Sequence, residues 1–189
     1  MKALILNFSI IALFVHQDLS AQPFSSIEIG ASLSSVTIFD KSYSKRWKIL
    51  PAKSLKVRTP FYIGIIGANI DLFEYQAKNS QVSDFTSINF SSYLGLNVLK
   101  FKSFSASTGV IVGIQKIETD SPEFDFNSEE RELYFAFSLE PKVQINRIIL
   151  FGDFQYRKIF NYYRQHLLTV GTGIRINLSV SKKVRDFVD

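Results

Sequence analysis

The chain contains no cysteine, and this absence removes several kinds of chemistry. No disulfide framework, thiolate metal site or thiol nucleophile can be built from it. Tryptophan and methionine occur once each, whereas phenylalanine and tyrosine number 18 and 8. This aromatic content is typical of β-sheets and membrane interfaces, and it does not suit a helical bundle.

The chain also lacks a concentrated block of one charge. Its formal net charge is +5, but the basic residues are spread along the sequence among acidic ones. The nearest clusters fall at 41–56 and 182–185. A nucleic-acid-binding protein shows a concentrated basic stripe. We therefore predict no nucleic-acid partner and assign these charges to loops and to an enclosed interior.

Long apolar runs are missing apart from one short run at the N-terminus. Lys2 precedes an apolar stretch from Ala3 to Val15, and a polar stretch then leads to Leu19-Ser20-Ala21. This order predicts a secretory signal peptide at 1–21 with cleavage after Ala21. A signal anchor is the alternative, although the run is shorter than the roughly 20 residues that span a bilayer. No later segment predicts a transmembrane helix.

The rest of the chain alternates between apolar and polar residues, most cleanly from Glu132 to Ile145. Successive side chains of a strand point to opposite faces, so this segment has one apolar face and one polar face. The apolar face carries Leu133, Phe135, Phe137, Leu139, Val143 and Ile145, and the polar face carries Glu132, Tyr134, Ala136, Ser138, Glu140, Lys142 and Gln144.

The same pattern recurs near 26–34, 85–98, 103–115 and 166–180. Several alternating runs are far longer than ordinary strands of about 5 to 6 residues. Their apolar faces carry almost no charge, and the opposite faces collect glycine, serine, asparagine and ionisable residues. A soluble core would fill its inner face with bulky apolar side chains. We therefore predict a transmembrane β-barrel with its apolar face toward lipid.

Seven strands are expected near 24–36, 60–75, 84–99, 102–117, 130–145, 147–158 and 165–180. Tight turns at 100–102 and 146–147 alternate with longer segments at 76–83, 118–129 and 159–164, and the short turns belong on the periplasmic side. This parity requires one more strand between the first two. Residues 46–57 supply it, with one face formed by Trp47, Ile49, Leu55 and Val57 and the other by Lys48, Ser54 and Lys56.

Pro51 makes this added strand the weakest, because proline removes a ladder donor. The alternative is a long loop at 39–58 with a strand hidden elsewhere. The predicted fold is all-β: an eight-stranded antiparallel up-and-down transmembrane β-barrel at 22–180, preceded by the cleaved signal peptide. A charged C-terminal tail at 181–189 follows it.

Three glycine-containing segments carry a resemblance to a known family: 29–34, 93–97 and 170–176. On these segments the chain, over 24–180, resembles small outer-membrane proteins grouped as the outer membrane protein β-barrel domain, a Bacteroidetes type that includes PorT-like proteins. The resemblance implies location in the cell outer membrane and a role in envelope assembly or secretion, and it transfers no catalytic residues. Many such barrels end on an aromatic residue, whereas here Phe187 lies within the charged tail.

The predicted inward faces carry a set of ionisable residues from several strands. An eight-stranded barrel is just wide enough for side chains to fill it. Buried charges are tolerated only when they are paired and hydrogen-bonded. We therefore expect salt-bridged layers that fill the lumen, in preference to a permeation path or proton relay, formed by Glu28, Asp71, Glu132, Glu140, Lys142, Asp153, Arg157 and Arg175.

Sites for chemistry are scarce. His166 is the one histidine after the signal peptide, and no serine lies within three positions of it, so we predict no catalytic set. The acidic segment 118–130 matches no calcium-loop pattern, so we predict no metal site and no cofactor. Phe160, Tyr162 and Tyr163 predict an aromatic girdle, and the nearby Arg157, Lys158 and Arg164 predict contact with lipopolysaccharide phosphates.

These features predict a non-enzymatic, monomeric outer-membrane barrel that contacts outer-membrane lipid and lipopolysaccharide, with a structural role or a partner bound through its loops. Three alternatives stay open. The first is an envelope-assembly or secretion accessory factor with an envelope protein partner. The second is a lipid-modifying barrel enzyme that uses His166. The third is a soluble, lipocalin-like periplasmic carrier, which would require an apolar interior.

Overall fold

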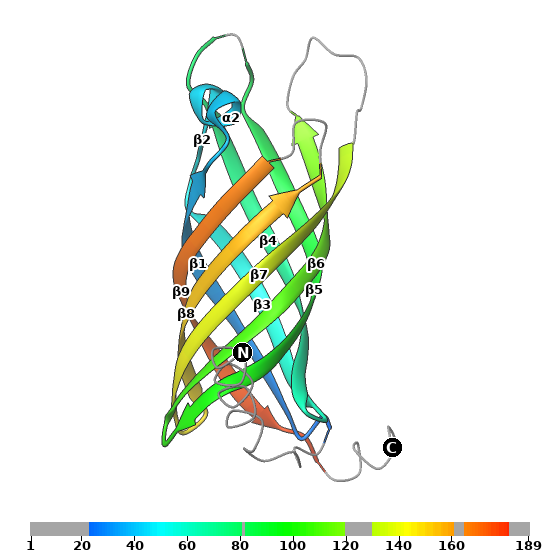
Figure 1. Cartoon of the computed structure of the whole chain (residues 1–189), viewed down its shortest axis with the longest axis vertical. Helices are drawn as coiled ribbons and strands as arrows, with labels where there is room; N and C mark the ends of the chain where they lie inside the picture. Colours follow the sequence, from blue (N-terminus) through cyan, green and yellow to red (C-terminus); the bar gives the residue numbers. More distant parts are fainter. Residues whose placement is uncertain (1–22, 81, 120–129, 161–164, 182–189) are drawn as a thin grey trace, which may run out of the picture.

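A computed structural model describes residues 23–80, 82–119, 130–160 and 165–181, which form one antiparallel sheet (Figure 1). The connection after the first strand also contains one short helix, α2 (Lys41–Arg46). The strands are β1 (Ser26–Ile38), β2 (Trp47–Ile49), β3 (Ala52–Phe61), β4 (Gly64–Ala77), β5 (Phe85–Phe101), β6 (Phe104–Thr119), β7 (Glu130–Ile145), β8 (Ile148–Ile159) and β9 (Gln165–Ser179).

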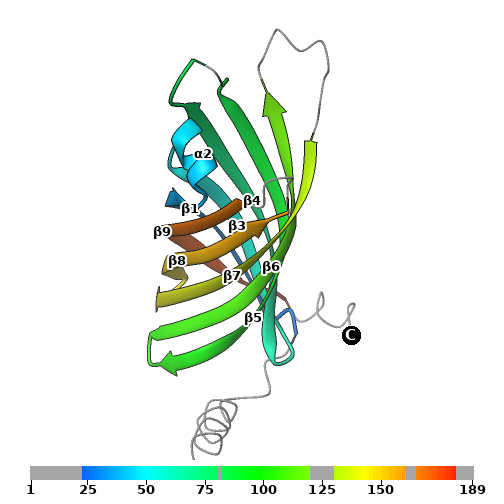
Figure 2. The same cartoon turned by 45° about the horizontal axis from the view of Figure 1, so that its top comes forward.

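The sheet closes on itself because β1 pairs with β9 as well as with β3. A walk through directly opposed residues begins at Glu28, passes to Arg58 on β3 and continues strand by strand around the sheet. It reaches Leu167 on β9 and returns to β1 at Ile38, ten residues beyond its start. This stagger tilts the strands around the barrel axis, as barrel closure requires (Figure 2).

β2 and β3 are two parts of one strand, since both pair with β4. Ile49 lies opposite Tyr75, whereas Lys53 lies opposite Leu72, so β4 has one residue fewer over this stretch. The extra residue forms a bulge at Leu50 and Pro51, where the missing proline donor removes no ladder bond. The described strands therefore form a closed eight-stranded barrel, as the sequence predicted.

The bulge corrects one part of the sequence prediction. Trp47 and Ile49 were expected on the same face as Leu55 and Val57. Ile49 is instead buried in the interior at 7% exposure, whereas Leu55 is 61% exposed on the outer wall. The inserted residue reverses the alternation. Odd-numbered residues therefore face the lumen before the bulge, and even-numbered residues face it after the bulge.

The connections alternate in length. Three two-residue turns lie at one end of the barrel, the turn end, and α2 lies at the other end, the loop end (Figure 1). The predicted turn at 100–102 lies slightly later, at Lys102 and Ser103, since β5 continues to Phe101. The first residue of each turn has a positive φ: 49° at Tyr62, 51° at Lys102 and 56° at Asn146.

The two faces of the sheet have opposite character. Large apolar side chains are exposed on the outer wall, including Phe137 at 68% and Leu94 at 58%. The interior holds buried polar and charged groups such as Arg157 and Asp71, each at 1% exposure. This arrangement is that of a transmembrane barrel and the reverse of a lipocalin-like carrier, so that alternative is wrong. No helix among the described residues is long and apolar enough to cross a membrane.

Candidate functional site

Three ionic groups stand out among the described interior residues, and the first surrounds Arg175 near the turn end of β9. Its Nη1 donates to Oε2 of Glu28 on β1 at 2.7 Å, and its Nη2 pairs with Glu140 on β7. Nζ of Lys142 lies 3.6 Å from Oε1 of the same Glu28. The ring of Phe151 lies 4.0 Å from the guanidinium carbon. Three strands that are far apart in sequence are thus joined through one arginine.

The second group joins Lys56 on β3 to Asp153 on β8. Nζ of Lys56 lies 2.6 Å from Oδ2 of Asp153, and the two side chains are 0% and 2% exposed. Nε2 of Gln155 donates to both carboxylate oxygens of Asp153, at 2.9 and 3.2 Å. The carboxylate thus receives hydrogen bonds and an opposite charge, which offset the cost of its burial.

The third group is centred on Arg157 of β8. Its Nη2 donates to Oδ2 of Asp71 on β4 at 2.7 Å and to Oε1 of Gln155 at 3.0 Å. The guanidinium also lies over two rings, 4.4 Å from the centroid of Tyr134 and 4.9 Å from that of Phe73. Because Arg157 points inward, the predicted contact between this residue and lipopolysaccharide phosphates is wrong.

The sequence analysis left two buried cations, Lys56 and Arg58, out of the interior set. Arg58 is 2% exposed, donates from Nη1 to the carbonyl oxygens of Val57 and Ala68 at 3.0 and 3.3 Å, and lies 4.0 Å from the Tyr93 ring. Both cations alternate with the apolar Leu55 and Val57, and this alternation could have placed them on the inward face. Glu132, a predicted member, is half-buried on the inward face of β7.

Toward the loop end, the interior contains a group of packed aromatic side chains. Tyr75 and Phe85 stack with ring centroids 4.1 Å apart, and the Trp47 ring meets Phe85 at 5.5 Å. Tyr75 and Tyr134 are 2% and 0% exposed. A buried hydrophobic cluster continues from there along the interior, so the described interior is filled with side chains; the cluster comprises Ile49, Ala52, Ile65, Phe73, Tyr75, Tyr93, Ile111, Tyr134, Ala136, Ile159 and Leu167.

The predicted aromatic girdle is described at one residue. Phe160 is 43% exposed, packs edge-on against Phe135 at 5.6 Å, and has Nζ of Lys158 5.3 Å from its ring centroid. Tyr162 and Tyr163 lie outside the described residues, as do 120–129 of the acidic segment. Phe160 and Lys158 thus place an aromatic ring and a cation together at the loop end of the outer wall.

A second aromatic group, at the turn end of the barrel, was missed. Phe24 meets Phe61 edge-on at 5.7 Å, and Phe61 meets Tyr62 at 4.6 Å. Phe101 is 65% exposed and Phe104 is 37% exposed at the neighbouring turn. The available signal was that Phe24, Phe61, Phe101 and Phe104 all lie at or beside ends of predicted strands. Aromatic side chains thus border the apolar wall at both ends, as in transmembrane barrels.

His166 lies on the outer wall near the loop end. Its Nδ1 is 2.7 Å from the hydroxyl oxygen of Tyr156 on β8, and Lys158 is its directly opposed neighbour. The hydrogen bond joins this histidine to a tyrosine, whereas activating a serine nucleophile requires contact with a serine hydroxyl. Within the described ranges, no cluster of three or more histidine, aspartate or glutamate residues could hold a metal ion.

The α2 helix covers part of the loop end and is held by its N-cap. Oδ1 of Asp40 accepts hydrogen bonds from the Ser42 hydroxyl at 2.6 Å and from the N–H groups of Ser42 and Tyr43 at 2.8 and 3.4 Å. The bond from the Ser42 hydroxyl is the main reason why the pKa of Asp40 falls below its ordinary value, followed by the two backbone bonds. The cap is therefore charged at neutral pH.

Contacts with the next connection fix the other end of this segment. Nζ of Lys78 donates to the carbonyl oxygen of Ser44 at 2.7 Å, and Nε1 of Trp47 donates to that of Ser83 at 3.0 Å. Lys41, Lys45 and Arg46 remain exposed on and beside this anchored helix. The loop end thus presents a fixed basic surface, which we call the α2 surface and define by Lys41, Lys45, Arg46 and Lys48.

Comparisons with known proteins identify the architecture. No protein-family model matches the chain, and no curated protein matches it. Among solved structures, the chain is similar to the Neisserial surface protein A, with a TM-score of 0.53, 8% identity and coverage of 80% of this chain and 95% of that one. It is also similar to the outer membrane protein OprG from Pseudomonas aeruginosa, with a TM-score of 0.51, 10% identity and coverage of 86% and 100%. These similarities show the fold, that of small outer-membrane β-barrels.

Proposed function

We propose that this chain is a non-enzymatic, monomeric anchor in the bacterial outer membrane, with a loop end that binds phosphate-bearing lipopolysaccharide. The filled interior is the observation that carries this proposal. Arg157, Arg175 and Lys56 are each at most 2% exposed, and each forms an ion pair with a residue of a strand that is not its neighbour in the sheet. An interior used in this way stabilises the barrel and leaves its surfaces to carry the function.

The ionic groups support a structural role over permeation. A conducting path needs charged side chains beside water, whereas Lys56 and Asp153 are almost fully enclosed and form an ion pair with each other. Breaking such a pair to admit an ion would leave a buried charge without its partner, which costs several kcal/mol, about 3 to 5. The aromatic cluster around Tyr75 and Phe85 adds a further obstruction toward the loop end.

The α2 surface supports the choice of ligand. It carries Lys41, Lys45, Arg46 and Lys48, and Asp40 is the one acidic residue within 39–48 and is used as a helix cap. Lysine and arginine near a membrane surface attract anionic groups, each contributing about 1 kcal/mol. Because α2 is tied to Lys78 and Trp47, these cations are held in place before binding, which reduces the ordering cost. An envelope protein with an acidic surface is the competing partner.

Two measurements on the full barrel test the proposal. In planar bilayers we expect no discrete conductance steps, and regular steps would overturn the filled-anchor role. For binding, Trp47 fluorescence is followed during titration with lipopolysaccharide micelles. A triple variant, Lys41→Gln with Lys45→Gln and Arg46→Gln, should weaken binding by about tenfold or more.

The matched control removes three exposed cations at the turn end, through Lys100→Gln, Lys102→Gln and Arg147→Gln. Its affinity for lipopolysaccharide should equal that of the unmodified barrel. Equal weakening in both triple variants would show that overall charge, and not the α2 surface, governs binding. An unchanged affinity in the α2 variant would point to the envelope protein partner.

A further inference from the structure

The outer wall contains a row of small residues that crosses four neighbouring strands. Thr172 on β9 lies directly opposite Gly152 on β8, and Pro141 on β7 lies directly opposite Ala106 on β6. On either side of them, Lys142 lies opposite Phe151 and Leu139 lies opposite Phe154. This register puts Gly152 beside Pro141. The row thus continues without a large apolar side chain from β9 to β6.

Large apolar residues border this row on both sides. Toward the loop end, the bordering row runs from β9 through β8 to β7. In it, Val170 lies directly opposite Phe154, which lies directly opposite Leu139. Toward the turn end, the corresponding wall is formed by four residues that are opposed in the same way and are all exposed, namely Ile174, Leu150, Val143 and Phe104. Small residues between two bulky rows make a furrow across the sheet.

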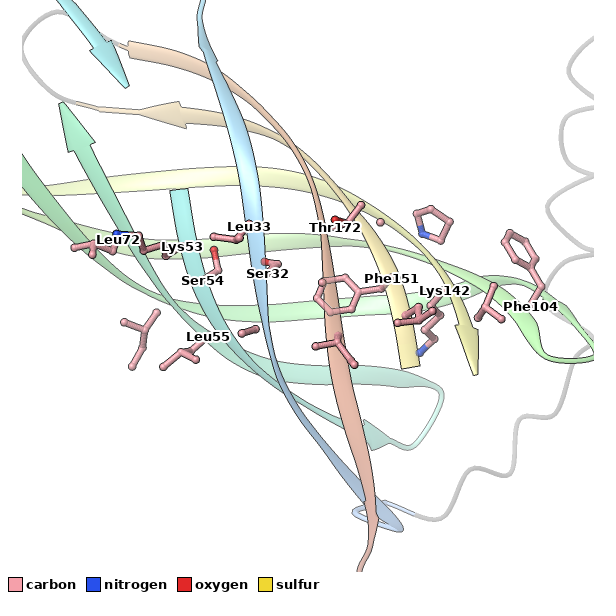
Figure 3. A pocket seen from close by; sticks show the side chains of 18 residues that line it. Ser32, Leu33, Lys53, Ser54, Leu55, Leu72, Phe104, Lys142, Phe151 and Thr172 are labelled. Atoms are coloured by element: carbon pink, nitrogen blue, oxygen red, sulfur yellow. The ribbon is translucent and has the colours of Figure 1, made fainter. Parts of the chain in front are cut away.

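This furrow is part of a groove of about 960 Å³ that continues across β1 to β3 and β4. Figure 3 shows Phe104 at one end and Lys53 with Leu72 at the other. Leu33, opposite Thr172 on β1, is followed by Lys53 and then Leu72 in the same register. Because of the barrel's stagger, the groove climbs from the turn end toward the loop end.

The outer side of Gly152 is crowded by neighbouring side chains. A Cβ built on Gly152 would lie 3.1 Å from Cγ of Pro141 and 3.1 Å from Cε2 of Phe154. Both atoms belong to side chains on the outer wall, so a larger residue here would push Pro141 and Phe154 aside and occupy part of the groove. A bulky substitution at Gly152 is therefore a way to block the groove.

The geometry points to one occupant: we propose that this groove binds an acyl chain of an outer-leaflet phosphorylated glycolipid of the lipid A type, with its headgroup phosphate at Lys53. On β7, β8 and β9 the two wall rows lie four residues apart, which is about 13 Å between Cα atoms. Side chains from both walls occupy part of that width. A helix, about 10 to 12 Å across with its side chains, does not fit, whereas a single methylene chain does.

Charge and position select the outer leaflet. Lys53 lies at the loop end of the groove, and its side chain is 60% exposed. Its Nζ donates to Oε1 of Glu74 at 2.8 Å, and an ammonium group has two further donors for a phosphate. Beside Lys53 the outward residues of β4 change from apolar Ile70 and Leu72 to Glu74, which marks the edge of the apolar wall.

The proposal rests on the proposed outer-membrane location and is independent of ligand binding at the α2 surface. Its test measures lipid A that remains on the full barrel after extraction from outer membranes in mild detergent, by native mass spectrometry. The unmodified barrel should retain lipid A at a stoichiometry near one. Gly152→Leu should reduce this retention at least fivefold, and Thr172→Leu is a second filling variant.

Ser92→Leu is the matched control, because Ser92 is a small, exposed residue on the outer face of β5, away from the groove. It should retain lipid A like the unmodified barrel. Lys53→Gln should reduce retention of bisphosphorylated lipid A and leave that of dephosphorylated lipid A unchanged. A heat-dependent mobility shift on gels shows which variants have folded, so a lost barrel is distinguished from a lost site.

Two outcomes would overturn the proposal. Retention by folded Gly152→Leu and Thr172→Leu equal to that of Ser92→Leu would show that the groove holds no specific chain. Since the chain has no cysteine, Thr172→Cys can report contact between copies. A disulfide-linked dimer of this variant in lipopolysaccharide-containing vesicles would assign the groove to a second copy of the chain.

Discussion

Lys56 on β3 and Asp153 on β8 form an ion pair of 2.6 Å across the interior, although β1 and β9 lie between their strands in the sheet. The pair therefore links opposite parts of the wall, which backbone hydrogen bonds join only through two intervening strands. Because both side chains are almost fully buried, its energetics differ from those of an ion pair in water.

Lys56→Met should destabilise the barrel by about 3 to 5 kcal/mol, because it leaves the buried Asp153 carboxylate without its cation. The measurement is urea unfolding in detergent micelles, followed by the loss of the heat-dependent gel shift. Lys53→Met is the control, since the Lys53–Glu74 pair is exposed and its loss should cost less than about 1 kcal/mol. Similar costs for both variants would contradict the enclosed pair.

Gly109→Val should destabilise the barrel by about 1 to 3 kcal/mol through overpacking. A Cβ at Gly109 would lie 2.7 Å from Cε2 of Tyr93 and 2.6 Å from the carbonyl oxygen of Leu94. The same unfolding assay applies. Val110→Leu, which enlarges the next residue on the outer wall, should change stability little. If both substitutions left the stability unchanged, the Tyr93 side chain would be shown to move aside at little cost.

Acidification should loosen α2 before the barrel unfolds. The pKa of Asp40 lies below its ordinary value of 3.8 because Ser42 and Tyr43 donate hydrogen bonds to its carboxylate. Its contribution to capping is therefore complete above that ordinary value and is lost as pH falls through the lowered pKa of the folded state. Trp47, which packs against Tyr43 with centroids 5.2 Å apart, reports the change by fluorescence.

Asp40→Asn is the matched variant for this pH effect, because asparagine also caps helices and does not titrate in this range. Its Trp47 signal should stay constant over the pH range in which the unmodified chain changes. A transition of equal size in Asp40→Asn would assign the effect to another group.

Deletion of Pro51 should remove the bulge and reverse the faces of β2. Ile49 and Trp47 would then turn toward the outer wall, because a shift of one residue exchanges the two faces of a strand. Brominated acyl chains in vesicles should quench Trp47 more strongly in the deletion than in the unmodified barrel. Pro51→Ala keeps the residue count and should leave quenching unchanged; stronger quenching there would contradict the role of the bulge.

The number of strands and the polarity of their two faces could be predicted, because successive side chains of a strand point to opposite faces and the sequence shows this alternation directly. Leu133 to Ile145 show an apolar outer set and a polar inner set, and the structure has the same assignment. Pro51 could be recognised as a weak point in a strand. Its effect on parity could not, since a bulge depends on the register with β4, which local alternation does not contain.

The interior pairings also depend on register. Sequence alternation placed Glu28, Glu140 and Arg175 on inward faces, but only the closed sheet brings them together around one guanidinium. Lys56 was placed on the polar face of the weak predicted strand at 46–57 without being counted in the ionic set, and Arg58 lay beyond the end of that strand. The groove was likewise beyond the sequence, because its floor combines Ala106, Pro141, Gly152 and Thr172 from four strands.

Because of the ten-residue stagger, residues that lie directly opposite one another on successive strands lie at successively different depths in the membrane. Ala106, Gly152, Thr172 and Leu33 belong to one row, yet each lies farther along the barrel axis than the one before it. Single cysteines at these positions in the cysteine-free chain would therefore sample the hydrocarbon region step by step. The order in which spin labels there respond to oxygen and to a water-soluble relaxant would measure the local bilayer thickness around the protein.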